Sequence, residues 1–167
     1  MAKGSQVDVT PFISKVSTQI DGEGLDYVNN TVKFVNTQIK IRPYNEDTAE
    51  DEKSIRWKRT ADEILKDNYV YEKKACTDMV IVFIVLCLAK GYECNFVKVK
   101  EKEGKRIHSV AEVRFGNEWY VVDVAGRNGV IKGQLSEGSE FGEWVYWKKG
   151  RDSWDIGMSS YDNKNET

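Results

Sequence analysis

The sequence predicts an α+β fold, with helices in the first half of the chain and an antiparallel sheet in the second. Apolar residues of the first half recur at the spacing of amphipathic helices. Short alternating segments of the second half are separated by glycine-containing turns. Because the helices precede the strands instead of alternating with them, α+β is favoured over α/β. The 167 residues, 40% of them hydrophobic, suffice for a single domain with a substantial core.

Two amphipathic helices are expected near the N-terminus. Thr10 suits the cap of the first and Pro11 its first helical position, and apolar side chains at helical spacing continue to Ile20. The second helix is predicted over residues 25–39. The segment 45–53 is acidic and has no hydrophobic period, so it is predicted to be a solvated loop. It also lacks the central glycine of an EF-hand, which argues against a calcium site.

The middle of the chain contains a capped helix and a wholly apolar one. Thr60 and Glu63 form a capping-box pattern that opens a short helix, and a tyrosine-rich connection follows at 68–71. Residues 79–90 include no Gly or Pro and are apolar on every side, which is typical of a helix buried in a core. Gly91 is the expected stop of this helix.

The sheet is predicted within residues 94–148. The segment 126–142 contains five glycines and is predicted to be a loop. The expected strands are 94–100, 106–115, 118–124 and 143–148. Three tryptophans at or after the last strand suit either a substrate groove or packing, and packing is preferred for most of them: Trp144, Trp147 and Trp154.

Charge and residue counts exclude several classes of protein. The 25 basic and 27 acidic side chains nearly cancel, whereas nucleic-acid binders are usually basic, so no nucleic-acid partner is expected. His108 is the only histidine, which excludes a metal site built on several histidines, and we expect neither a metal nor a cofactor. The three cysteines do not suggest a disulfide framework of the secreted kind.

The chain is expected to be cytoplasmic and to have no membrane partner. Its first residues lack the apolar segment of a secretory signal. The longest apolar run, 79–89, is shorter than the roughly 20 residues that a membrane-spanning helix needs. The sequence predicts no particular oligomeric state.

Cys76 is a candidate nucleophile because it lies just ahead of, or in the first turn of, the apolar helix. A helix N-terminus stabilises a thiolate through its free backbone N–H groups and its dipole, and two preceding lysines add positive charge. Asp78 either opposes this effect or simply favours the helix start. The competing interpretation is an inert, small apolar residue, which is also how we interpret Cys87 and Cys94.

His108 and Asp123 are predicted to be neighbours on one face of a hairpin. If Gly116-Asn117 is a two-residue turn, Val110 lies opposite Asp123, and His108 lies diagonal to it on the same face. A carboxylate there would fix the tautomer of the imidazole and stabilise the imidazolium. A change of one residue in the turn would put the two side chains on opposite faces, leaving an ordinary surface histidine.

Residues 59–125 resemble the transglutaminase-like core domain of the papain-like cysteine enzymes. The resemblance combines a cysteine before a long apolar helix, a His-x-x-x-Glu segment and a Trp-x-x-x-Asp segment, in that order. The segments that match are 60–65, 75–78 leading into 79–91, 108–112 and 118–123. The segment 149–157 is also similar to the tail of microbial members.

This resemblance implies a papain-like cysteine proteinase fold in one domain. The nucleophilic cysteine would start a central buried helix, and the N-terminal helices would pack on the antiparallel sheet. The expected parts are N-terminal helices (1–55), a catalytic core (56–125) and a C-terminal loop and strand (126–167).

The resemblance also implies a chemistry that needs no cofactor. Cys76 would attack an amide carbonyl of a peptide or protein, His108 would act as general base and then as acid, and Asp123 would orient His108. The intermediate would be a thioester. An amine acceptor would give cross-linking and water would give hydrolysis, as in the proteases and peptide:N-glycanases among the relatives.

The oxyanion donor and the activity itself stay open at the level of sequence. The backbone N–H of Cys76 would be one donor, and an upstream group would be the second; Trp57, Tyr69 and Tyr71 are the candidates. The sequence departs from the usual family pattern around the cysteine, the histidine and the aspartate. A catalytically silent peptide- or protein-binding module is therefore the alternative function. The departures are at Lys74, Val110 and Val124.

Overall fold

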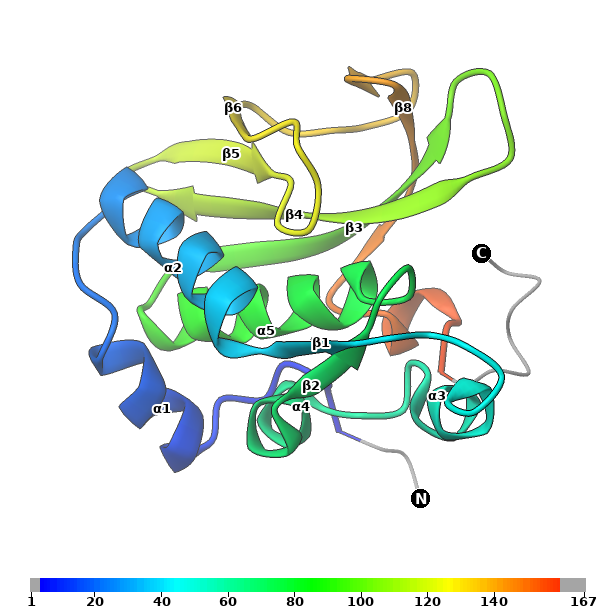
Figure 1. Ribbon diagram of the computed structural model, residues 1–167. Helices are drawn as coiled ribbons and strands as arrows, with labels where there is room; N and C mark the ends of the chain where they lie inside the picture. The colour runs from blue at the N-terminus through cyan, green and yellow to red at the C-terminus, as the bar shows by residue number, and fades with distance from the viewer. Residues whose placement is uncertain (1–3, 160–167) are drawn as a thin grey trace.

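The computed structural model describes residues 4–159 and has the predicted α+β organisation. A six-stranded sheet lies on one side of a long central helix, and further helices pack around that helix (Figure 1). The helices are α1 (Pro11–Thr18), α2 (Leu25–Gln38), α3 (Ala49–Ile55), α4 (Ala61–Asp67), α5 (Cys76–Ala89) and the 3-10 helix η1 (Trp154–Ile156).

The strands form two sheets. The smaller sheet pairs β1 (Lys40–Arg42) with β2 (Tyr69–Tyr71) in parallel. The larger sheet is antiparallel and has the order β6-β5-β4-β3-β8-β7. Its strands are β3 (Glu93–Glu101), β4 (Ile107–Phe115), β5 (Glu118–Val122), β6 (Val130–Lys132), β7 (Glu140–Phe141) and β8 (Trp144–Gly150).

The helix α5 is the centre of the structure and is buried at every residue from Thr77 to Cys87. The helices α1, α2 and α4 and the strands β3 and β4 all pack on it. This environment explains why its sequence has no polar face. Gly91, just after the helix, has the left-handed backbone (φ +99°) expected of a C-terminal stop. Apolar as it is, α5 is too short to span a bilayer, and no other helix within residues 4–159 qualifies.

The predicted N-terminal caps are present. The Thr10 hydroxyl accepts a hydrogen bond from the Ile13 amide (3.2 Å), and α1 begins at Pro11. Thr60 and Glu63 form the reciprocal capping box of α4. α1 and α2 end slightly before the predicted positions, which is within the usual latitude of helix boundaries.

The prediction of a solvated loop at 45–53 is wrong, because α3 begins within this segment. The inward side of α3 carries Glu52, which is 3% exposed and ion-paired with Arg56. The buried position of this helix is thus occupied by a charged residue. A helical period is recognised in a sequence from its apolar residues, so a search for that period could not detect α3.

Two further segments that the sequence predicted as connections contain short strands. Residues 68–71 include β2, and residues 126–142 include β6 and β7, which form the two edges of the antiparallel sheet. Strands of two or three residues are too short to show alternation, and the partner of β2 lies far away in the sequence.

The antiparallel sheet has an apolar core on each face. One face packs on α5 and includes Phe96, Ala111 and Val113. The opposite face is covered by the segment 126–142. The residues of this second core are Val97, Val99, Val110, Val121, Leu135, Phe141 and Trp144.

Glu112 fastens the segment 126–142 to the second face of the sheet. Its carboxylate is fully buried and accepts hydrogen bonds from the Leu135 amide (2.7 Å) and the Asn95 side chain (2.9 Å). The Lys149 ammonium lies 2.8 Å away and balances its charge. A buried carboxylate is tolerated only with partners of this kind.

Replacing Glu112 by Ala should destabilise the protein by about 3–5 kcal/mol, because the Lys149 ammonium and the Leu135 amide lose their acceptor. Glu118→Ala is the matched control. Glu118 is exposed, lies 3.8 Å from Lys132, and should contribute about 0–1 kcal/mol. Urea unfolding followed by circular dichroism measures both variants. Equal losses of stability would contradict the role assigned to Glu112.

Candidate active site

Cys76 is the first residue of α5, as the sequence predicted, and lies where the helix presents free backbone N–H groups. Ala75 is the N-cap and makes no side-chain capping bond. The thiol is half-buried and forms no disulfide. It hydrogen-bonds with the ring of His108 and with the backbone amide of Ser109 on β4.

The hairpin of β4 and β5 brings His108 to Asp123. The predicted register is confirmed, since Phe115 pairs with Glu118 across the two-residue turn. His108 Nε2 lies 2.6 Å from Asp123 Oδ1. Because Asp123 engages Nε2, Nδ1 is the ring nitrogen that remains for the sulfur of Cys76. His108 therefore lies between the sulfur of Cys76 and the carboxylate of Asp123.

The loop after β5 holds the Asp123 carboxylate. Asp123 Oδ2 accepts hydrogen bonds from the backbone amide and the side-chain amide of Asn128, each at 3.1 Å. The same loop passes so close that a Cβ at Gly126 would lie 2.3 Å from Asp123 Oδ2. Only glycine allows this approach. The oxygen that does not face His108 is thus satisfied, and the carboxylate has a fixed orientation.

Trp144, the first residue of β8, covers the imidazole. The centroids of the Trp144 and His108 rings are 5.0 Å apart, and their planes meet at 25°. Trp144 is itself buried, and the Arg106 guanidinium lies 5.3 Å from its ring centroid. This stack fixes the plane of the imidazole and shields it from water.

The electrostatics of the site favour a thiolate beside an imidazolium. Burial raises the pKa of the Cys76 thiol, but His108, Lys98 and the Ser109 amide more than offset this and lower it to about 6. Burial lowers the pKa of His108, whereas its bonds to Asp123 and Cys76 raise it to about 9. Burial raises the pKa of Asp123, yet its bond to His108 brings it below the ordinary value. Between the first two values, sulfur is anionic and imidazole is cationic.

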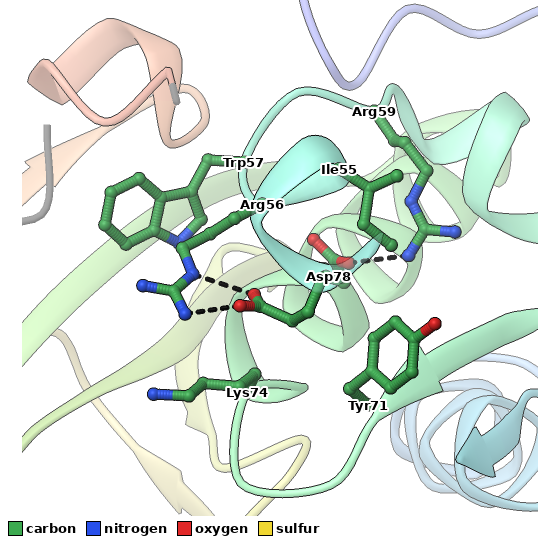
Figure 2. Close-up of a pocket in the computed structure, with 8 residues that line it drawn as sticks. Ile55, Arg56, Trp57, Arg59, Tyr71, Lys74 and Asp78 are labelled. Atoms are coloured by element: carbon green, nitrogen blue, oxygen red, sulfur yellow. Dashed lines mark hydrogen bonds and ion pairs between the residues drawn. The ribbon is translucent and has the colours of Figure 1, made fainter. Parts of the chain in front are cut away.

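Asp78, in the first turn of α5, does not act on the thiolate as an unbalanced charge. Its carboxylate pairs with the buried Arg59 guanidinium at 2.9 Å (Figure 2). Burial raises the pKa of Asp78, and Arg59 counteracts that rise. The negative charge of Asp78 is therefore balanced by Arg59 and does not oppose a thiolate at Cys76.

An open cleft of about 790 Å³ gives access to the three side chains. Cys76, His108 and Asp123 all line it, together with Trp144. The walls come from the segment before α5, the β3–β4 hairpin, the loop after β5 and the start of β8. Charged side chains of both signs lie around it: Glu72, Lys73, Lys105, Arg106, Arg127 and Glu143.

The other three sequence candidates lie outside this cleft. Trp57 and Tyr71 line a separate small hollow beside the Arg59–Asp78 pair (Figure 2). The hydroxyls of Tyr69 and Tyr71 both donate to the carboxylate of one residue in α3, Asp51. No contact of Trp57, Tyr69 or Tyr71 with the cleft supports a role as oxyanion donor, and that role stays a prediction.

Sequence reasoning missed Lys98, Gly126 and Asn128. Lys98 lies in an alternating strand, where a lysine is usually taken to face solvent. The one feature that could have indicated its position is the register of β3 and β4, which places Lys98 directly opposite Ser109. Gly126 and Asn128 are typical loop residues, and no local pattern distinguishes them from other turn positions.

Cys87 and Cys94 lie at the opposite end of α5, where they hydrogen-bond with each other. Burial raises the pKa of the Cys87 thiol well above its usual range, and Cys94 adds to this rise. The features that activate a thiol are a helix N-terminus and neighbouring cations, and they meet at Cys76 alone among the three cysteines.

The architecture is similar to that of solved structures with little sequence identity. A "putative cysteine protease" from Cytophaga hutchinsonii matches with a TM-score of 0.61 at 13% identity, over 88% of this chain and 44% of that chain. A TGase matches with a TM-score of 0.48 at 16% identity, over 81% and 35% of the two chains. A "putative protease" from Parabacteroides distasonis gives 0.43 at 12% identity, over 72% and 26%.

The chain has the transglutaminase-like fold that its motifs predicted. It spans less than half the length of the Cytophaga hutchinsonii protein. Neither a scan of protein-family models nor a search of curated proteins found a match.

Alkylation of Cys76 by iodoacetamide should stay fast down to near pH 6 and decline below it, because only the thiolate reacts. Free cysteine in the same tube should lose reactivity below about pH 8.5. Peptide mass spectrometry measures the modification of each cysteine separately, and Cys87 should stay unmodified at every pH. A Cys76 profile that coincides with that of free cysteine would disprove the thiolate–imidazolium pair.

Proposed function

We propose that this protein is a cysteine-dependent enzyme that acts on amide bonds of peptides or proteins. Cys76 is the nucleophile, His108 the general acid and base, and Asp123 the residue that orients His108. The observation that carries this proposal is the continuous contact from sulfur through imidazole to carboxylate at the wall of an open cleft.

In the first step, the Cys76 thiolate attacks the carbonyl carbon of the amide. The resulting oxyanion would be stabilised by the backbone N–H of Cys76 at the start of α5. The His108 imidazolium then gives its proton to the amide nitrogen, the C–N bond breaks, and ammonia or an amine leaves. The product is a thioester on Cys76 and a neutral His108.

In the second step, His108 accepts a proton from an incoming water or primary amine. The oxygen or nitrogen attacks the thioester carbonyl, the C–S bond breaks, and the Cys76 thiolate is regenerated beside the imidazolium. Water yields a carboxylic acid, so the enzyme is a hydrolase. An amine yields a new amide, so the enzyme is an acyl transferase.

The geometry favours this enzyme over a catalytically silent binding module. The residues that depart from the family pattern are not among those that line the cleft: Val110 and Val124 are buried in the two cores, and Lys74 lies over the Tyr44 ring. His108 faces Cys76, and the segment 126–142 leaves the cleft open.

Peptides that contain glutamine, incubated with and without a fluorescent primary amine, test this function. Acyl transfer gives a fluorescent peptide, whereas hydrolysis gives ammonia or shorter peptides without the amine; mass spectrometry detects all of these products. Cys76→Ala and His108→Ala should abolish turnover, and Asp123→Asn should lower kcat by several orders of magnitude, as in other triads.

Cys94→Ala is the matched control, because it removes a half-buried thiol far from His108 and should retain full activity. Activity that persists in a folded Cys76→Ala protein would rule out the proposed nucleophile. Peptides that bind the wild-type protein and are never modified, on a Cys76 that does not alkylate at neutral pH, would support the binding module instead.

A further inference from the structure

Lys98 is a lysine in the interior of the protein, in the middle of β3, and is 2% exposed. Its Nζ donates a hydrogen bond to Ser109 Oγ (2.8 Å) and lies 3.5 Å from Thr77 Oγ1. The two hydroxyl oxygens are themselves 2.9 Å apart. An ammonium group and two hydroxyls thus form a small polar cluster between β3, β4 and the first turn of α5.

This cluster lies directly next to the candidate active site. Thr77 follows Cys76 in α5, and Ser109 follows His108 in β4. The backbone amide of Ser109 hydrogen-bonds the sulfur of Cys76. Because the strand register pairs Lys98 with Ser109, the ammonium is held on the inner side of the cysteine and histidine.

No carboxylate forms an ion pair with Lys98 among residues 4–159. Asp78 in α5 is paired with Arg59, and Asp123 is paired with His108. On the other neighbouring strand, β8, the residue opposite Lys98 is a lysine.

The titratable group of the site that acts on Lys98 is therefore Cys76. Burial lowers the pKa of Lys98, and the negative charge of the Cys76 sulfur raises it. Within the described part of the chain, Cys76 is thus the group that can serve as the counter-ion of this ammonium.

We propose that Lys98 is a positioning residue of the site, a buried ammonium group that stabilises the Cys76 sulfur as a thiolate. The inference rests on the proposed function, and it places a second cation beside the sulfur in addition to the His108 imidazolium. A buried lysine without a carboxylate partner is costly, so a purely structural role would be served better by an apolar side chain. When the C–S bond of the thioester breaks in the second step, Lys98 and the His108 imidazolium are both beside the sulfur as it regains its negative charge.

Lys98→Met tests this role, with Lys100→Met as its matched control. Lys100 lies two residues along the same strand, but it is exposed and lies over the Trp147 ring (4.1 Å). Alkylation of Cys76 by iodoacetamide is followed against pH by peptide mass spectrometry. Lys98→Met should raise the midpoint of the alkylation–pH profile of Cys76 by about 1 pH unit, and the alkylation rate at pH 6.5 should fall about threefold. Lys100→Met should leave the profile unchanged.

Thermal unfolding supplies a second readout that separates function from structure. Lys98→Met should keep or raise Tm, because a buried charge is removed and Thr77 and Ser109 still bond each other. Lys98→Gln, which is neutral but polar, gives the same test if the methionine variant does not fold. Its midpoint should also rise.

An unchanged midpoint in a folded Lys98 variant would overturn the inference and leave the proposed function intact. The same holds if Lys100→Met shifts the midpoint equally. A wild-type midpoint near that of free cysteine would overturn the proposed function, and the inference with it.

Discussion

The burial of α5 on every side is the constraint on which the rest of the structure depends. Three helices and two strands pack against it, so its first residue has a fixed position relative to β4. Cys76 therefore meets the ring of His108 and the amide of Ser109 without a mobile loop between them. A side chain on a rigid element is held more precisely than one on a loop, which the proposed function would require.

A second consequence of this burial is that charged groups must be neutralised inside the protein. Asp78 has Arg59, Glu112 has Lys149, and Asp123 has His108 as partners. Each pair links two different secondary-structure elements or loops, so the charges help to specify which segments meet. In the proposed site the cysteine sulfur follows the same pattern, as an anion beside two cations and a helix N-terminus.

The sequence predicted the large elements because their signals are local. A capping box, an apolar run and a two-residue turn define α4, α5 and the β4–β5 hairpin, and the turn alone sufficed to bring His108 to Asp123. The failures concern features whose cause is tertiary. α3 buries a glutamate instead of an apolar residue, and β2, β6 and β7 are too short to have a period. The burial of Lys98 and the contacts of Asn128 depend on neighbours from other strands and loops.

Gly126 has a consequence for how the site would respond to random substitution. It has no functional group, yet any side chain at this position would collide with the carboxylate of Asp123 and push it off the imidazole. In a complete mutational scan for the proposed activity it should tolerate no replacement, and its profile would resemble those of the proposed catalytic residues. A mutational scan alone would therefore suggest a chemical role for Gly126, although this residue contributes only by having no side chain.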